Sequence, residues 1–458
     1  MSVCYPEFHY RWSWQLGHTP AELWPYIADT NRFNHNTGLP CVECHPLTPE
    51  ESVNARRKLS FKRMGVTVEW TEEPFEWLEP RRSGVVRRNS RGPVDRMRVV
   101  AELEPYQDGT RLFYQIWARP ANPIGLLAIP IQIGRLTSRA FGRVFTQYDE
   151  WIEEDRRPTQ EQTQSFVSGG RHRLTGELVN AGADPDVTEA LGRAVVEGSD
   201  LDLIKMRPYA LADEWALPRR TVLDAFLLST RLGLHDVSWD VLCPLCRGAK
   251  DTTTNLAGIL PQVHCETCNI DFDVDFDRSV ELTFRPGSTI REVGRTEYCV
   301  AGPRVTPHVV VQQLLQPSEK RIVSPELEEG PHRIRTLRLA RGRYLDVKDE
   351  GPSSVDVDAT PSGWGREAVA IGLTPTLSLR NDTDEEQLFV LERMVVDGFC
   401  GHGRRIHPPC SGTGTSSLST PFAPGSGSLS ETSPSCSPIC ADRPECIGKS
   451  GMPPRSGW

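Results

Sequence analysis

The sequence lacks the features of membrane proteins, of secreted proteins and of nucleic-acid-binding proteins. Its first residues, MSVCYPEFHYRW, hold no basic leader and no apolar core, so no signal peptide is expected. The longest apolar stretch, residues 123–133, is too short to cross a bilayer and contains Pro130. The formal net charge is −9 over 458 residues, whereas nucleic-acid binders are normally basic. We therefore expect a cytoplasmic protein without a membrane span, and no nucleic-acid partner.

The motifs of common enzymes are also missing from the sequence. It contains no Walker loop, no nucleophile elbow, no HExxH and no glycine-rich dinucleotide fingerprint. Isolated His, Asp and Ser residues are numerous, but no constellation singles them out. From the residues alone, no catalytic site is predicted.

Four of the thirteen cysteines have the spacing of a zinc site. Cys243 and Cys246 form one C-x2-C pair, Cys265 and Cys268 form another, and eighteen residues separate the pairs. Two thiolates on one tight turn both face an ion, and two such turns complete a closed tetrahedral shell. We predict one structural zinc ion, and no chemistry at it. Disulfides, which a cytoplasmic location disfavours, and free thiols are the alternatives.

The other candidate metal ligands in the sequence do not predict a second metal site. His264 is a spare ligand that four cysteines make unnecessary, and the lone pair Cys41 and Cys44 has no partner pair nearby. Residues 270–277 alternate apolar and acidic side chains, which predicts a strand with a solvated acidic face. A calcium loop would need glycine where Phe276 stands.

The first 155 residues predict one folded unit of strands and helices. Residues 8–16 alternate as a half-buried strand does, and Thr19, Pro20 and Glu22 form a helix start with a capping box. Residues 123–133 favour a buried loop, with a membrane-dipping segment as the alternative. A long amphipathic helix is expected over 134–154, and its apolar side is predicted to carry Leu136, Phe141, Val144, Phe145, Tyr148 and Trp151. Further strands are expected over 57–62, 66–71, 83–89, 97–103 and 110–118.

This order resembles the START-like ligand-binding domains, particularly those that open with a segment like FHYRWSWQLGHTPAELWPYIADTNRFNHNTGLP. The resemblance implies a helix-grip fold, in which a curved sheet wraps a long helix and leaves an apolar cavity. Aromatic side chains are mainly core material; alternatively, some line a cavity for an apolar small molecule. The candidates for the cavity wall are Trp12, Trp14, Trp24, Trp70 and Trp117.

The rest of the chain predicts an α+β multidomain protein. Residues 171–235 are helical and resemble a winged helix, with Arg219 and Arg220 where a DNA reader places its base contacts. Acidic neighbours favour a structural role instead. The expected units are a START-like helix-grip domain at 1–155, a linker at 156–170, a winged-helix-like segment at 171–235, a zinc ribbon at 236–280, a β-sandwich at 281–395 and a disordered tail at 396–458.

A second resemblance covers about residues 8–395. The segments WDVLCPLCRGAK, HCETCNIDFDVDFDRSVELTFRP, YCVAGPRVTPHVVVQQLL and LRNDTDEEQLFVLER resemble the N-terminal part of bacterial class III adenylate/guanylate cyclases that begin with a START-like domain. In those relatives a cyclase domain follows soon after the FVLER strand. There, aspartates bind two divalent cations, magnesium or manganese, and a dimer forms a cyclic nucleotide. Neither aspartate region is found here.

The tail after residue 395 has a second interpretation. It is rich in Gly, Ser and Pro, which predicts disorder. Read one frame over, with free third bases, residues 435–444 are compatible with Val-Leu-Phe-Thr-Asp-Leu-Arg-Gly-Ser-Thr, the opening of a class III cyclase. We infer a frameshift near residue 395 that truncates the catalytic domain.

The leading hypothesis is the regulatory half of a cyclase in cyclic nucleotide signal transduction, without the activity itself. A zinc-containing winged-helix DNA-binding regulator and a START-like small-molecule-binding protein or enzyme are the alternatives. The sequence leaves open whether the chain forms a homodimer.

Overall fold

The computed structural model of the chain describes residues 5–45, 55–63, 65–153, 169–243, 249–265, 270–294, 297–365 and 368–394. These residues belong to one of the two units into which the chain divides, Met1–Gly412. The expected tail and most of the expected linker lie outside the described residues. None of the helices in the described ranges has the length and apolarity needed to cross a membrane.

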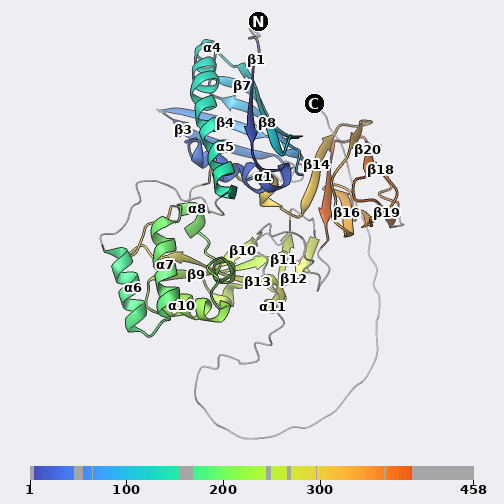
Figure 1. Cartoon of the computed structure of the whole chain (residues 1–458). Coiled ribbons are helices and arrows are strands. Elements are labelled where there is room, and N and C mark those ends of the chain that lie inside the picture. The colour runs from blue at the N-terminus through green and yellow to red at the C-terminus, as the bar shows by residue number, and fades with distance from the viewer. Residues whose placement is uncertain are drawn as a thin grey trace, which may run out of the picture. The chain divides into compact units, whose positions relative to one another are not determined.

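The N-terminal part is an antiparallel sheet with a long helix across one face (Figure 1). This is the layout of a helix grip, as the sequence predicted. The strands, in spatial order, are β1 (Phe8–Leu16), β8 (Gly109–Pro120), β7 (Val94–Tyr106), β6 (Arg82–Arg91), β4 (Val66–Glu72), β3 (Arg57–Arg63) and β2 (Glu43–His45). The helices are α1 (Pro20–Ile27), α2 (Thr30–Asn36), α4 (Pro123–Ile129) and α5 (Ser138–Glu153).

Local sequence explains how this sheet and its helices begin. Side chains of β1 alternate between the exposed and the inner face. The predicted capping box is confirmed, because the Thr19 hydroxyl accepts from the Glu22 N–H while the Glu22 carboxylate accepts from the Thr19 N–H. Gly109 allows β8 to start against β1, since a Cβ there would lie 2.1 Å from the Leu16 carbonyl oxygen.

The expectation of a buried loop at 123–133 is wrong. This stretch forms α4 and then a π-helical turn, Pro130–Thr137, that leads into α5. Pro130 has no N–H for the regular helical ladder, which accounts for the wider turn at that point. Leu136, predicted on the buried side, is 59% exposed. The other predicted apolar positions of the long helix are confirmed as buried: Phe141, Val144, Phe145, Tyr148 and Trp151.

The middle part consists of helices followed by a small sheet. Asp184 caps its second helix, and Gly233 has a φ of +71° just after the last helix. Phe226 of that helix packs on Phe284 of the sheet, with ring centroids 4.9 Å apart. The helices are α6 (Gly170–Asn180), α7 (Pro185–Glu197), α8 (Asp200–Leu203), α9 (Pro208–Glu214) and α10 (Arg219–Arg231), and the sheet order is β10 (Ala249–Thr253), β9 (His235–Leu242), β13 (Val280–Pro286).

The cysteine-rich segment adds a two-stranded hairpin, β11 (Gln262–Cys265) with β12 (Ile270–Asp273). The predicted strand over 270–277 ends early, because α11 (Phe276–Ser279) follows it. Strand β13 pairs with β9 and therefore belongs to the middle part. The predicted start of a β-sandwich at residue 281 is thus too early by one strand.

The C-terminal strands form two sheets around an aliphatic core that includes Val311, Leu345, Leu377 and Leu391. The sequence predicts strands here at 309–315, 332–339, 368–373, 377–380 and 387–393, and it does not predict those found at 320–323, 343–347 and 354–359. One sheet has the order β14 (Val309–Leu315), β21 (Gln387–Arg393), β16 (Gly330–Thr336), β17 (Arg343–Val347) and β19 (Val369–Ile371); the other has the order β15 (Lys320–Val323), β20 (Thr376–Asn381) and β18 (Ser354–Ala359).

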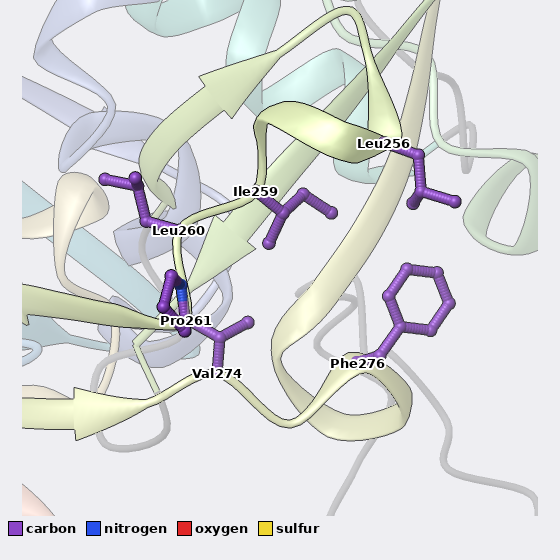
Figure 2. A pocket seen from close by; sticks show the side chains of 6 residues that line it. All are labelled: Leu256, Ile259, Leu260, Pro261, Val274 and Phe276. Atoms are coloured by element: carbon purple, nitrogen blue, oxygen red, sulfur yellow. The ribbon is translucent and has the colours of Figure 1, made fainter.

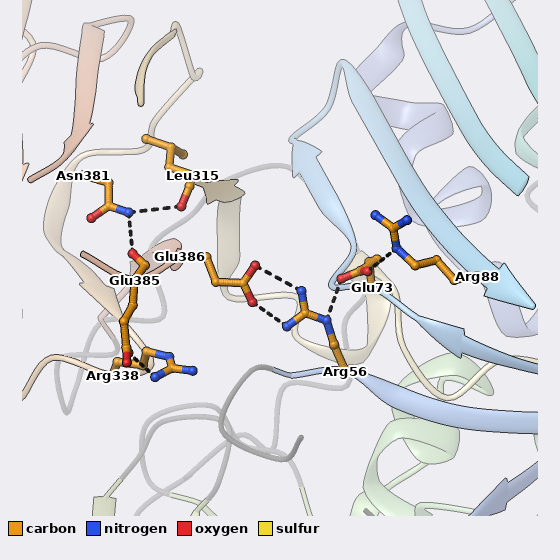
Figure 3. A network of polar contacts seen from close by, with 8 residues as sticks. All are labelled: Arg56, Glu73, Arg88, Leu315, Arg338, Asn381, Glu385 and Glu386. Atoms are coloured by element: carbon orange, nitrogen blue, oxygen red, sulfur yellow. Dashed lines mark hydrogen bonds and ion pairs between the residues drawn. The ribbon is translucent and has the colours of Figure 1, made fainter. Parts of the chain in front are cut away.

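The first of these sheets continues the sheet of the helix-grip domain. Strand β5 (Glu76–Leu78) pairs with β6 on one side and with β14 on the other. The Trp77 indole N–H donates to the Val309 carbonyl oxygen at 2.8 Å. Arg56 joins the same two parts, because its guanidinium donates to Glu73 at 2.7 Å and to Glu386 at 3.0 Å (Figure 3). The two β-rich parts are therefore joined through their backbones as well as their side chains.

Candidate functional site

Aromatic side chains fill the space between α5 and the concave face of the helix-grip sheet. Phe33 of α2 lies 4.9 Å from Phe141 and 5.2 Å from Phe145, measured between ring centroids. Tyr114 of β8 lies 4.8 Å from Phe141. This cluster sits where the START-like resemblance implies a cavity, and it makes the deep interior a packed core.

Three of the tryptophans predicted for the cavity wall belong to this core. Trp12 meets Phe141 edge-on at 6.2 Å, and Trp14 lies 5.0 Å from Phe145. Gly142 makes room for Trp14, because a Cβ there would lie 3.0 Å from the indole nitrogen. Trp24 is 5% exposed and packs in the same core.

The other two tryptophans are placed differently. Trp117 alternates with Ile116 and Ala118 on β8 and therefore faces away from α5. On that outer face it stacks on His9 at 4.5 Å, with the guanidinium of Arg98 at 5.0 Å. Trp70 is buried on β4, on the same inward face as the polar groups described next.

The concave face carries one buried ion pair, which sequence reasoning missed. Glu72 of β4 is directly opposite Arg87 of β6, and Arg87 is opposite Met97, a member of the core. The Arg87 Nε donates to the Glu72 Oε2 at 2.9 Å. Glu72 is 1% exposed. A carboxylate at an inward strand position was the available signal, but nothing in the sequence identified its partner.

Several buried polar atoms around this pair have no hydrogen-bond partner among the described residues. They are the Glu72 Oε1, the Trp70 Nε1 and the Asn89 Oδ1. Trp70 is opposite Asn89 across the β4–β6 ladder, one inward position from the Glu72–Arg87 pair. Two acceptors and one donor thus point into one end of the concave face. Unpaired buried polar atoms are costly, so each needs an explanation, and a bound ligand is one.

A segment from far along the chain closes this interior. We call residues 297–302 the strap. The Asn31 Oδ1 of α2 accepts from the N–H groups of Tyr298 and Cys299, at 2.7 and 3.0 Å, and the Asn34 Nδ2 donates to the Tyr298 carbonyl oxygen at 2.8 Å. The Thr30 hydroxyl lies 3.2 Å from the Cys299 Sγ and 2.9 Å from the Ala301 carbonyl oxygen.

The strap is built into the hydrophobic core of the helix-grip domain. Cys299 is 6% exposed and belongs to the core that also contains Phe33 and Phe145. A pocket of about 300 Å³ lies where the strap meets α2, lined by Asp29, Thr30, Asn31, Glu297, Cys299, Val300, Arg304 and Val305.

Electrostatics couple the strap to the ion pair. Burial raises the pKa of the Cys299 thiol, and the Glu72 carboxylate raises it further, while Arg87 opposes both. Burial also raises the pKa of the Tyr114 phenol, again opposed by Arg87. At neutral pH the thiol and the phenol are therefore neutral.

The structure describes two of the four predicted zinc ligands. Cys243 follows β9 and Cys265 ends β11, and both are fully buried in one cluster with Val241 and Phe272. Cys246 and Cys268 lie outside the described residues. Within the described ranges, no three His, Cys, Asp or Glu side chains are close enough to hold a metal ion. Two buried thiols in one cluster fit the chemistry of a zinc site, which stays a prediction.

The other side chains considered as metal ligands make contacts of their own. The His264 Nδ1 lies 2.9 Å from the Asp271 Oδ1, across the hairpin. The lone Cys44 contacts Glu297 at the start of the strap, with 3.9 Å between the Sγ and the Oε2. An apolar pocket of about 410 Å³ opens beside the hairpin (Figure 2), lined by Leu256, Ile259, Leu260, Pro261, Val274 and Phe276.

The two arginines considered for DNA reading each have an acidic partner. Arg219 donates twice to Asp213 at 2.7 Å, and Arg220 donates to Asp224 at 3.1 and 3.2 Å. Their charge is therefore compensated on their own surface.

Comparisons with known proteins add two findings. The sequence pattern of a family of unknown function, DUF5939, matches residues 172–297, which include both cysteine pairs. No curated protein matches the chain.

Solved structures resemble about a third of the chain. The Zhui aromatase/cyclase from Streptomyces sp. R1128 is 13% identical over 32% of this chain and 96% of its own, with a TM-score of 0.25. A conserved protein from Geobacillus kaustophilus is 17% identical over 33% of this chain and 98% of its own, with a TM-score of 0.25. The Mll3558 protein from Rhizobium loti is 17% identical over 30% and 97%, with a TM-score of 0.24. Scores this low carry no inference about ligand or activity.

Proposed function

We propose that this chain is the sensory and regulatory part of a cytoplasmic class III nucleotide cyclase. Its helix-grip domain binds an apolar small molecule, and the strap passes the bound state to the C-terminal strands. The observation that carries the proposal is the strap itself, whose backbone is hydrogen-bonded to α2 and whose Cys299 packs in the helix-grip core. A domain that only stored a ligand would not need a distant segment in its core.

The relay has a short physical path. A ligand that enters beside the aromatic cluster displaces side chains against α2 or against the strap, because a close-packed core leaves no slack. The strap leads through a single helical turn, Pro303–Val305, into β14. Strand β14 pairs with β5 of the helix-grip sheet and with β21. In the cyclases that the sequence resembles, the catalytic domain follows the strand that corresponds to β21.

The polar atoms of the concave face indicate the ligand's chemistry. The Glu72 Oε1 and the Asn89 Oδ1 are acceptors and the Trp70 Nε1 is a donor, and none of the three has a partner among the described residues. A mostly apolar molecule with one hydroxyl group would satisfy a donor and an acceptor there and leave its apolar part to the aromatic cluster. The predicted zinc ion, held by the four cysteines, would brace the middle part and take no part in binding.

Binding is tested with 2-naphthol as the probe and naphthalene as the matched control without a hydroxyl. We expect 2-naphthol to quench tryptophan fluorescence of the full chain and to bind at least about tenfold more tightly, as one buried hydrogen bond allows. Hydrogen exchange of the strap and β14 should change on binding. Equal binding of both probes, or exchange that changes only within residues 5–153, contradicts the proposal.

The relay is tested at Asn31. Asn31→Ala removes the acceptor of two strap N–H groups, whereas Asn31→Asp keeps it. We expect faster exchange in the strap and β14 for Asn31→Ala only. Resequencing the locus tests whether the chain belongs to a cyclase. If the reading frame continues into a cyclase domain, turnover of ATP or GTP with manganese can be measured in both Asn31 variants of that longer chain. An intact frame with this tail, or robust turnover by this chain alone, contradicts it.

A second candidate is a helix-grip enzyme, which the Glu72–Arg87 pair favours. A buried carboxylate with one oxygen that has no partner among the described residues is suited to general acid–base chemistry. Mass spectrometry of any co-purified molecule, before and after incubation with the chain, separates the two. An unchanged mass supports a sensor, whereas a change of mass that disappears in Glu72→Gln supports an enzyme. A salt-dependent shift of duplex DNA would instead support the DNA-binding alternative.

A further inference from the structure

The outer face of α4 and the π-helical turn exposes a stripe of large apolar side chains. Ile124 is 71% exposed, Leu127 is 73% exposed and Ile131 is 57% exposed. Their spacing of three and four residues places them on one side of the helix. Leu136 lies further along and is 59% exposed. Single exposed apolar residues are ordinary, but a continuous stripe marks an interaction site.

The fold buries the other side of this helix, and none of the described residues covers the stripe. Gly125 and Ile129 are buried against the domain. Gly125 comes so close to the β6–β7 turn that a Cβ would lie 2.0 Å from the Pro93 carbonyl oxygen. The helix is thus apolar on both sides, whereas a helix that only covers a soluble core is polar on its outer side.

The same outer side becomes basic beyond the stripe. Arg135 and Arg139 follow Ile131 at intervals of four residues and are exposed. Residues 120–148 contain three arginines and no Asp or Glu. Nothing in the described residues forms an ion pair with Arg135, Arg139 or Arg143.

The charges beside α4 are already compensated. On the strands next to the β6–β7 turn, Arg119 donates to Asp95 at 2.6 Å and Arg91 lies 3.5 Å from Glu69. They therefore add no net negative charge that would oppose an anionic surface. The uncompensated charge in this region is positive and lies along the helix.

We propose that α4 and the π-helical turn form a contact for a bilayer surface that contains anionic lipid. The apolar stripe enters the boundary between headgroups and acyl chains, as interfacial helices do. Arg135 and Arg139, one and two turns further on, contact anionic headgroups. The helix lies on the surface and does not cross it, in agreement with its length (Figure 1). This contact is independent of the ligand proposed for the interior.

Flotation of the purified full chain with vesicles tests the proposal. We expect binding to vesicles of phosphatidylcholine with phosphatidylglycerol to be at least about tenfold tighter than to phosphatidylcholine alone. Binding should weaken between about 0.05 and about 0.5 M salt, because exposed charges are screened. Ile131→Asp with Leu127→Asp should abolish it, and Arg135→Ser with Arg139→Ser should remove the preference for anionic lipid.

Ile322→Asp is the matched control, since Ile322 is 65% exposed on β15 and distant in sequence. It should leave vesicle binding unchanged, as should Asn31→Ala in α2. Circular dichroism and thermal unfolding verify that each variant is folded. Equal affinity for both vesicle types, or no binding, overturns the proposal. A concentration-dependent dimer that Leu127→Asp dissociates also overturns it, because the occupant is then a second copy of the chain.

Discussion

Two buried carboxylates in this chain differ in how many of their oxygens accept hydrogen bonds. Glu392, in the C-terminal sheet, accepts on both oxygens: from Arg333 at 2.7 Å and from Arg335 at 3.1 Å to each. Glu72, in the helix-grip domain, accepts on one oxygen from Arg87, and its other oxygen has no partner among the described residues. Both residues are 1% exposed. A saturated carboxylate holds structure together, whereas one with capacity to spare is suited to binding.

The largest effect is expected from Glu392→Gln. It leaves the buried guanidinium groups of Arg333 and Arg335 without their counter-charge, which costs about 3–5 kcal/mol. Hydrogen exchange of β16 and β21 measures the free energy of opening. Glu328→Gln is the control, because its pair with Arg393 is 73% exposed on the Glu328 side and should cost under about 1 kcal/mol. Equal costs for the two variants would show that Glu392 is not the structural anchor.

The next effect is a pH dependence of the same site. Burial alone would raise the pKa of Glu392. The nearby His308, whose Nε2 lies 3.6 Å from the Oε2, together with the hydrogen bonds and charge of Arg335 and the charge of Arg333, outweighs burial and holds the pKa at about 2, against an ordinary 4.5. A folded-state pKa below the unfolded one means that the stabilisation is full above about pH 4.5 and is lost as the pH falls toward 2.

This amounts to roughly 3 kcal/mol over the window. The opening free energy of β21, measured at pH 7, 4 and 3, should fall for the native chain and stay flatter for Glu392→Gln. Parallel curves would contradict the low pKa.

A smaller loss is expected from Glu72→Gln. The Arg87 side chain keeps 18% of its surface exposed, so its charge retains some contact with water. We expect a cost of about 1–2 kcal/mol in the opening of β4 and β6. Replacing both partners, with Glu72→Met and Arg87→Met, should recover most of that stability but not the binding of 2-naphthol. If Glu72→Gln costs as much as Glu392→Gln, the distinction between the two carboxylates fails.

The smallest effect is a difference between two tryptophans. Trp77→Phe removes the hydrogen bond to the Val309 carbonyl oxygen, while Trp70→Phe removes an N–H that has no partner among the described residues. Both indoles are buried, at 3% and 6% exposure, so the loss of volume is matched. We expect Trp77→Phe to cost about 1 kcal/mol more in thermal unfolding. A larger loss for Trp70→Phe would show that its N–H has a partner after all.

Local patterns predicted the parts of the fold that depend on neighbours in sequence. The capping box at Thr19 and the buried side of α5 follow from spacing alone and are confirmed. The helix at 123–129 was missed because an apolar stretch that contains a proline was assigned to the interior. Its exposure could not be predicted, since a pattern that is apolar all round does not show which side the fold covers.

Contacts between distant segments were beyond reach of such patterns. The Thr30 hydroxyl meets Cys299 across 269 residues, and no feature of residues 297–302 distinguishes a strap from a loop. Arg87 falls in the predicted strand 83–89, but the predicted strand 66–71 ends one residue before Glu72, and no local pattern placed the two residues on a common face. The four cysteines were found because metal spacing is itself a local pattern.

The pairing of β5 with β14 also has a consequence for synthesis. Trp77 and its acceptor at Val309 are 232 residues apart. At ribosomal rates of about 5–20 residues per second, the partner strand emerges on the order of ten seconds to under a minute after β5. During that interval the nascent sheet has an uncovered edge and an interior without its strap, the state in which β proteins aggregate. Lower growth temperatures or co-expressed chaperones should therefore raise the soluble yield of this chain. Truncated versions that end before residue 309 should be the least soluble.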